Sequence, residues 1–190
     1  MDDNKLVEKI ISDQSQDAFK ELVVKYQNMV INTCYGFVHN YDDAQDIAQE
    51  VFVEVHRSIK KFRQESKFST WLYRISANKS INYIRDHKKN KWLFNLDLLF
   101  EKDDENPERI GLEESPQEIL EKDEKSDILY NAIDSLPENQ KMAFTLYKYD
   151  DLSYKEIGEV MDLSLSSVES LMFRAKKNLQ KKLISIYKKN

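Results

Sequence analysis

Apolar side chains recur every three or four residues along most of this chain, which is the spacing of helices that bury one face. The pattern predicts a helix from Gln16 to His39, a second that begins at Asp42 or Asp43, and a third from Phe68 onward. No stretch alternates apolar and polar residues between turn residues, as a half-buried strand would. Because the 190 residues include only three glycines and three prolines, an all-α fold is predicted.

The regular helical pattern stops near Asn95. The stretch EKDDENPERIGLEESPQE that follows holds two prolines, a glycine and many acids. Such a chain repels itself and buries too little apolar surface to fold, so residues 93–121 are predicted to form an acidic flexible linker. The apolar run WLFNLDLLF, from Trp92 to Phe100, either packs on the preceding helices or waits for a partner surface. The helices before the linker are expected to form one small domain over residues 5–92.

The helical pattern returns near Lys122 and predicts a second small domain over residues 122–188. Its first helix ends at Pro137, which can open the next helix. Further along, Ser153 and Glu156 have the spacing of a capping box, in which each side chain satisfies a free backbone amide at the start of a helix. A short helix is therefore predicted from this point.

A tight turn at Asp162 and Leu163 separates this short helix from a longer one. Ser164 is a suitable N-cap for the longer helix, and Ser166 with Glu169 offers a competing start two residues later. A short helix, a turn and a longer helix with a basic end predict a helix-turn-helix, and an ordinary antiparallel helix pair with a solvated basic face is the alternative. The inward positions of the longer helix are predicted to be Leu165, Val168, Leu171 or Met172, Ala175 and Leu179.

In a helix-turn-helix, the second helix lies in the major groove of DNA with its N-terminal side chains at the base edges. Hydroxyl and carboxylate groups can read bases there, and glutamate can accept a hydrogen bond from cytosine N4. Lysine and arginine further along the helix can bind phosphates, which makes binding depend on salt. The outward set predicted to face DNA is Ser166, Ser167, Glu169, Ser170, Phe173, Arg174 and Lys177.

The net charge of −5 argues against a nucleic-acid binder, but the charge is distributed unevenly. Residues 56–91 hold eleven Lys and Arg against two acids, and residues 97–127 hold thirteen acids against four Lys and Arg. Residues 164–190 hold seven Lys and Arg against one acid. The chain is therefore a basic block, an acidic spacer and a basic tail, and the sign of each part matters more than the total.

The helix that begins near Asp43 carries acids on the face that its apolar stripe leaves outside. Such a face repels DNA and suits a basic protein partner, although taken alone it could also be an ordinary solvated face. Its residues, with one exposed aliphatic side chain among them, are Asp43, Asp46, Gln49, Glu50, Val53 and Glu54.

The stretch FSTWLYRISANKSINYIRDHKK, from Phe68 to Lys89, mixes aromatic rings with positive charge. Rings among cations are useful where bases leave the double helix, because each base stacked on a ring gains roughly 1–3 kcal/mol. The break from Phe62 to Phe68 is the predicted site for a flipped base, held by Arg63 and Lys67. Trp71 could instead be a core residue, and the two asparagines, Asn78 and Asn82, could bond a base edge or act inside the fold.

Two long stretches resemble an extracytoplasmic-function (ECF) sigma factor. DDAQDIAQEVFVEVHRSIKKFRQESKFSTWLYRISANKSINYIRDHKK resembles its region two, and LPENQKMAFTLYKYDDLSYKEIGEVMDLSLSSVESLMFRAKKNLQKKL resembles its region four. The run D-A-x-D-[IL]-x-Q-E-V-F beside F-x-T-W-L-Y-R-I is highly specific to that family. With their helical lead-ins, the two stretches cover most of the chain.

The resemblance implies a bacterial initiation factor whose partners are core RNA polymerase and promoter DNA. The acidic face would dock on the β′ clamp helices, region two would capture and melt the minus-ten element, and region four would read the minus-thirty-five element and touch the β flap. The linker would thread toward the RNA exit path, and an anti-sigma factor is expected as a further partner. The minus-ten set would be Phe62, Arg63, Lys67, Phe68, Trp71, Asn78, Lys79, Asn82 and Arg85.

The sequence departs from the common pattern of that family in several places. Many relatives have Asp where Asn82 stands, and His56 replaces a frequent Trp or Phe. Glu169 and Leu171 stand where many relatives carry Lys and Arg, which lowers the positive charge at the groove. The promoter sequence therefore cannot be copied from relatives. Gly158 and Asp162 stand where Ala and Gly are usual.

No catalytic, cofactor-binding or metal-binding motif is recognised, so neither an enzyme nor a small-molecule substrate is expected. The single cysteine, Cys34, lies among apolar residues and is predicted to be a buried, inert thiol. Without a secretory signal or a membrane-length apolar run, a cytoplasmic location is expected. The alternatives are a free-standing transcription factor that uses only the helix-turn-helix, and an interaction protein that titrates an anti-sigma factor.

Overall fold

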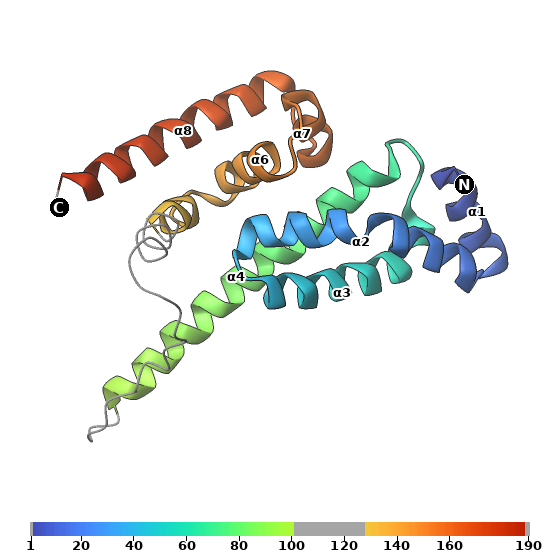
Figure 1. Cartoon of the computed structure of the whole chain (residues 1–190), viewed down its shortest axis with the longest axis horizontal. Helices are drawn as coiled ribbons and strands as arrows, with labels where there is room; N and C mark the ends of the chain where they lie inside the picture. The colour runs from blue at the N-terminus through green and yellow to red at the C-terminus, as the bar shows by residue number, and fades with distance from the viewer. Residues whose placement is uncertain (1, 101–127, 189–190) are drawn as a thin grey trace, which may run out of the picture.

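The computed structural model describes residues 2–100 and 128–188, with side chains except at 88–100 and 187. Within these ranges the regular structure is helical and no strand occurs, so the all-α prediction is confirmed. Figure 1 shows two helical units lying side by side, one formed by α1–α4 and the other by α6–α8. The predicted linker falls mostly on residues outside the described ranges.

The first unit contains α1 (Asp3–Asp13), α2 (Gln16–Val38), α3 (Tyr41–Ser58), the 3-10 turn η1 (Ile59–Lys61) and α4 (Phe68–Phe100). The helices α2, α3 and α4 pack against one another and bury their apolar stripes in one core. Cys34 lies in this core as predicted, and burial raises the pKa of its thiol to about 11. A thiol held protonated in this way is not a nucleophile.

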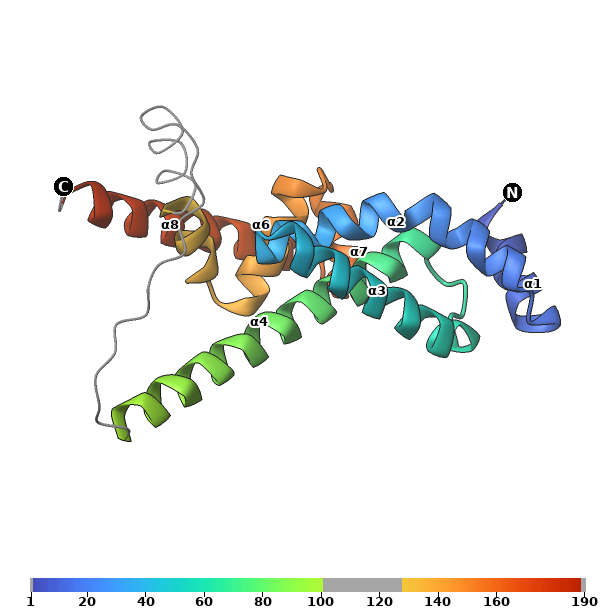
Figure 2. The same ribbon diagram turned by 60° about the horizontal axis from the view of Figure 1, so that its bottom comes forward.

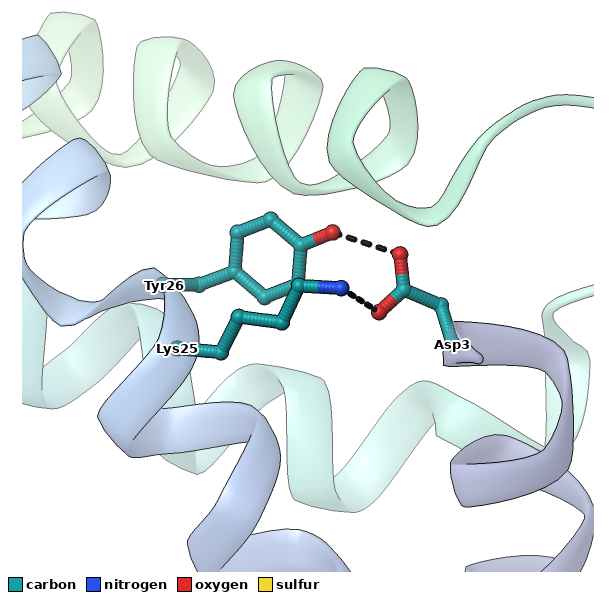
Figure 3. A network of polar contacts seen from close by, with 3 residues as sticks. All are labelled: Asp3, Lys25 and Tyr26. Atoms are coloured by element: carbon teal, nitrogen blue, oxygen red, sulfur yellow. Dashed lines mark hydrogen bonds and ion pairs between the residues drawn. The ribbon is translucent and has the colours of Figure 1, made fainter. Parts of the chain in front are cut away.

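The sequence pattern did not predict α1, and a polar network shows what holds it. The Asp3 carboxylate accepts hydrogen bonds from the Lys25 ammonium at 2.5 Å and from the Tyr26 hydroxyl at 2.6 Å (Figure 3). Leu6, Val7 and Ile10 of the same helix are buried against the core. The helix is therefore held both by its buried apolar face and by polar contacts to α2.

Two boundaries in the first unit differ from the prediction. Asn40 caps α3, with its side-chain oxygen accepting from the amide of Asp43 at 3.0 Å, so the predicted caps Asp42 and Asp43 lie inside the first turn. The backbone of α4 continues to Phe100, past the predicted stop near Asn95, and its last part projects away from both units (Figures 1 and 2). The side chains of the apolar run from Trp92 to Phe100 lie outside those described.

The second unit contains helical residues 128–134, α6 (Glu138–Tyr149), α7 (Tyr154–Met161) and α8 (Leu165–Tyr187). The capping box of Ser153 and Glu156 is present, and Ser164 caps α8 rather than the competing Ser166. Leu165 was predicted to point inward but is 52% exposed as the first residue of α8. The other predicted inward residues are buried, namely Val168, Leu171, Met172, Ala175 and Leu179.

The two units meet along a contact surface, the seam, in which α2 packs on α6 and α4 packs on α7. The Thr33 hydroxyl donates to Asp150 at 2.7 Å, and the His39 ring stacks on Tyr130 with centroids 3.9 Å apart. Gly36 allows the close approach of α2 and α6, since a Cβ atom there would lie 3.0 Å from atoms of Thr145 and Tyr149.

On the other side of the seam, the Arg74 guanidinium of α4 donates to two carbonyls at the end of α7. Its Nε lies 2.7 Å from the oxygen of Val160, and its Nη2 lies 2.8 Å from the oxygen of Glu159. The neighbouring Tyr73 packs against the core of the second unit. Residues far apart in sequence therefore close the molecule into the arrangement of Figure 2.

Candidate nucleic-acid and polymerase interfaces

The acidic face of α3 lies on the surface as predicted. Asp46, Gln49 and Glu50 are exposed, and Val53 is 49% exposed in the middle of the face. Asp43 and Glu54 are half-buried. Helix α3 keeps this face outward because its other side carries the apolar stripe of Ala44, Ile47, Ala48, Val51 and Val55, all buried in the core.

One ion pair joins this acidic face to α4. The Lys79 ammonium lies 3.5 Å from a carboxylate oxygen of Glu50. Tyr83, one turn further along α4, has its pKa raised to about 12 by burial and by a hydrogen bond to Asp43. The two helices therefore place the acidic face and the outer face of α4 next to each other.

The rings predicted to stack on bases form a cluster among themselves. Phe62 is 7% exposed and Phe68 is 2% exposed, and their rings meet edge to face at 5.7 Å. Trp71 lies against both, and Tyr26 packs on Phe68 from α2. Both phenylalanines of the predicted minus-ten set are therefore buried in this structure, because burial in the core outweighs exposure for rings beside a short loop.

The loop that these rings anchor is open to solvent. Arg63, Gln64, Glu65, Ser66 and Lys67 are all exposed, and Gln64 has a positive φ of 57° that turns the chain sharply. Buried rings at both ends fix where the loop begins and ends. The loop is therefore a polar, partly basic segment that is exposed to solvent and fixed at both ends.

The outer face of α4 continues from this loop. Asn78, Asn82 and Arg85 are exposed at intervals of three and four, and Lys79 is half-buried beside them. Asn82 accepts a hydrogen bond from the Arg85 guanidinium at 2.9 Å, so its amide is held by its own helix. Arg74 lies one turn before Asn78 on the same face of α4, but its guanidinium is hydrogen-bonded to Val160 in the seam.

The helix-turn-helix has the local geometry that its sequence predicts. The turn is made by Asp162, which has a φ of 57° and ends α7 with its amide donating to Gly158. Gly158 has no space for a side chain, since a Cβ atom there would lie 2.8 Å from the carbonyl oxygen of Leu163. The absence of a side chain at this position lets the turn fold back tightly onto α7.

The outward face of α8 is exposed near its start. Ser166, Glu169, Ser170, Phe173, Arg174 and Lys177 are exposed, and Ser167 is half-buried near the cap. Five of them, Ser166, Glu169, Ser170, Phe173 and Arg174, line a shallow hollow of about 690 Å³. Phe173 is 68% exposed, which is unusual for so large an apolar side chain.

Family models match both units: Sigma-70 region 2 matches residues 22–90, and Sigma-70, region 4 matches residues 126–179. The ECF RNA polymerase sigma-E factor of Escherichia coli (strain K12) is 34% identical over 181 residues, which cover 95% of this chain and 94% of that protein. This chain belongs to the ECF sigma factor family. Its resemblance to that family is therefore confirmed, and it is a sigma factor that binds core RNA polymerase and directs promoter-specific initiation.

Other relatives agree with this family. The RNA polymerase sigma-H factor of Pseudomonas aeruginosa is 33% identical over 95% of this chain and 93% of that protein. The structure of CnrH in complex with the cytosolic domain of CnrY has a TM-score of 0.65 at 21% identity, covering 96% of this chain and 97% of that one. The second likeness shows that the fold extends across both regions of this sigma factor.

Two further surfaces of the sigma factor were not predicted. The seam was missed because its partners are too far apart in sequence to leave a local pattern. A cavity of about 750 Å³ also lies between the start of α2 and the end of α3, where Phe19 meets the ring of His56 edge to face at 5.1 Å. The His56 side chain is exposed, and its ring contact with Phe19 places it at the margin of the core.

The described residues add two findings of absence. Within residues 2–100 and 128–188, no group of three or more His, Cys, Asp or Glu could hold a metal ion. Over the same described part of the chain, no helix has the length and apolar character to cross a bilayer.

Proposed function

We propose that this sigma factor divides initiation between its two regions. Region 2, over residues 5–92, grips the polymerase and opens the minus-ten element, and region 4, over residues 122–188, reads the minus-thirty-five element and touches the β flap. Residues 93–121 connect them as an acidic linker. One observation carries the proposal. Three surfaces are exposed on a chain of the sigma factor fold: the acidic face of α3, the basic surface of the loop and α4, and the helix-turn-helix.

The acidic face of α3 is the proposed docking surface for the β′ clamp helices. It gathers negative charge around the exposed Val53, so a basic partner could bury an apolar centre inside a charged rim. The set is Asp43, Asp46, Gln49, Glu50, Val53 and Glu54.

The loop after η1 and the outer face of α4 form the proposed minus-ten surface. Arg63 and Lys67 would hold the backbone of a displaced strand, and Trp71 is half-buried at the edge where a base could reach it. Phe62 and Phe68 would act by fixing both ends of the loop. Further along α4, the surface continues through Asn78, Lys79, Asn82 and Arg85.

The start of α8 is the proposed reader of the minus-thirty-five element. Ser166, Ser167 and Ser170 can bond either donors or acceptors, and the ring of Phe173 suits the methyl group of a thymine. Arg174 and Lys177 stand further along the helix, where phosphates would meet them. Binding is therefore expected to weaken as salt rises.

We place the protein in the cytoplasm and treat it as a factor rather than an enzyme, because its action is binding and the polymerase performs the chemistry. An anti-sigma factor is the further partner we propose. In solved structures that share this fold, CnrH is bound to the cytosolic domain of CnrY, and RpoE from Bartonella quintana is bound to the anti-sigma factor NepR.

Run-off transcription with core enzyme and genomic fragments tests the proposal. We expect specific start sites that depend on added sigma factor. The Asp46→Arg variant should abolish polymerase binding in a pull-down while its circular dichroism stays normal, and the Glu8→Arg variant, which changes an exposed acid on α1, is the matched control.

Each alternative has a distinct outcome. DNA binding without polymerase binding would indicate a free-standing transcription factor. Binding to an anti-sigma factor with no transcription from any fragment would indicate a titrating protein.

A further inference from the structure

Glu169 stands at the end of α8 that we propose to enter the major groove. It lines the shallow hollow with Ser166, Ser170, Phe173 and Arg174, and its side chain is exposed. Among the described residues, no side chain bonds to its carboxylate, so it does not serve the fold. The chemistry of that carboxylate is therefore available to whatever fills the hollow.

Glu169 forms no ion pair among the described residues, although Arg174 lines the same hollow. From Leu163 to Phe173 it is the only charged residue of the sequence. The next cation, Arg174, folds back along the helix and donates from Nε to the carbonyl of Ser170 at 3.1 Å. Lys176 lies over the ring of Tyr147, 5.5 Å from its centroid, on another side of the helix.

A carboxylate without an ion-pair partner is costly close to DNA phosphates, because like charges repel and the groove desolvates the group. A base whose major-groove edge offers hydrogen-bond donors offsets this cost, and a base whose edge offers acceptors adds to it. In the major groove, guanine presents two acceptors and thymine presents one, whereas cytosine presents the N4 amino donor. Adenine presents a donor beside an acceptor, so it satisfies a carboxylate less well.

We propose that Glu169 makes this sigma factor require a C·G pair at one position of the minus-thirty-five element, with cytosine on the strand that α8 faces. The carboxylate accepts from cytosine N4 and rejects guanine at the same position. This inference rests on the proposed function of region 4 and names the base that region 4 selects. Ser166 and Ser170 beside it carry no charge, so Glu169 is the charged group at this part of the helix.

The test uses holoenzyme formed from full-length protein and core polymerase. A start site mapped by run-off transcription supplies the promoter, and its minus-thirty-five element is randomised one base pair at a time. Transcript abundance is then measured by sequencing for the wild type, Glu169→Gln and Glu169→Arg. Glu138→Gln, an exposed carboxylate on α6 outside the hollow, is the matched control.

For the wild type and Glu138→Gln, we expect cytosine to be preferred over guanine by roughly 5- to 150-fold at one position, the range for one good base contact. Glu169→Gln should reduce this preference toward equality, since an amide both donates and accepts. Glu169→Arg should invert it, because arginine pairs with the two acceptors of guanine.

A second measurement leaves the protein unchanged. The preferred cytosine is replaced by 2-pyrimidinone, which lacks the 4-amino group, and wild-type holoenzyme should lose the same preference on that template. An unchanged base preference in Glu169→Gln, or full activity on the 2-pyrimidinone template, would overturn the inference. A complete absence of specific transcription by the wild type would instead refute the proposed function.

Discussion

The interiors of the two regions and the seam between them are built from different chemistry. Each interior is apolar: region 2 has one core shared by α1–α4, and region 4 has two smaller clusters around α6–α8. The seam is polar and aromatic, with hydroxyl, carboxylate, imidazole and guanidinium groups. A small cavity of about 160 Å³ also remains beside it, lined by Ile81, Ile84, Arg85, Asp134, Leu136, Glu138 and Lys141.

Hydrogen-bond satisfaction shows the difference most clearly. Among the described residues, the buried side-chain atoms without a partner are Nδ1 and Nε2 of His39, Oγ1 of Thr145 and Oδ2 of Asp150. All of them lie along the seam, and none lies in a core. Buried polar atoms without partners cost free energy that water would relieve. The comparison teaches that each region should be stable by itself, and that the contact between them should open readily.

The largest effect is expected from a core substitution. Leu146 is fully buried in region 4, so Leu146→Ala should lower the free energy of unfolding of that region by about 2–5 kcal/mol. Both tryptophans lie in α4, so urea unfolding followed by fluorescence reports region 2 and by circular dichroism reports both regions. We expect the fluorescence transition to stay unchanged.

Leu165→Ala is the control for this substitution, because the same residue type is 52% exposed there and should change stability by less than about 0.5 kcal/mol. If Leu146→Ala also moved the fluorescence transition, the two regions would unfold as one unit and the comparison would break.

An intermediate effect is expected at Arg74. Its two hydrogen bonds reach carbonyls at the negative end of the α7 dipole, and charged hydrogen bonds of this kind are strong when buried. Because the guanidinium is exposed, Arg74→Ala should shift the equilibrium toward the open arrangement by about 1–2 kcal/mol. Small-angle X-ray scattering should show a larger radius of gyration, with Arg57→Ala on the surface of α3 as the control. An unchanged radius would mean that other contacts hold the seam.

The smallest effect is expected from pH, because two buried groups in the seam oppose each other. Burial raises the pKa of Asp150 to about 6 from an ordinary 3.8, and it lowers the pKa of His39 to about 4 from an ordinary 6.5. The closed seam therefore binds the proton of Asp150 more tightly than an open one, and acidification from about pH 6 toward 4 favours closure. It binds the proton of His39 less tightly, so acidification from 6.5 toward 4 favours opening.

The radius of gyration of the wild type should accordingly vary little between pH 7 and 4. Asp150→Asn leaves only the histidine, and its radius should grow on acidification. His39→Gln leaves only the carboxyl, and its radius should shrink. Variants that respond in the same direction would show that these two groups do not control the seam.

Local rules made much of the fold predictable. The capping box of Ser153 and Glu156 and the cap at Ser164 depend on residues a few positions apart, which the sequence displays directly. Where several suitable caps stand close together, as around Asn40, the sequence does not choose among them. Leu6, Val7 and Ile10 have helical spacing that could have predicted α1, whereas its place on α2 depends on Asp3 reaching Tyr26, 23 positions away.

The candidate surfaces were predictable only in part. Helical periodicity separated the exposed acids of α3 and the exposed start of α8 from the cores beneath them. It could not decide whether Phe62 and Phe68 face inward, because they flank a loop that has no period. The seam depends on pairs such as Thr33 with Asp150, which are 117 residues apart. The local sequence around either residue does not predict its contact with the other.

The ion pair between Glu50 and Lys79 belongs to both proposed working surfaces at once. While the carboxylate holds the ammonium, each partly hides the other from outside ligands. A cationic group arriving from the polymerase would replace Lys79 at Glu50 and free the lysine for a phosphate. Such an exchange would give assembly a direction, with the enzyme loaded first and the promoter captured second, at a cost of less than about 1 kcal/mol because the pair is exposed.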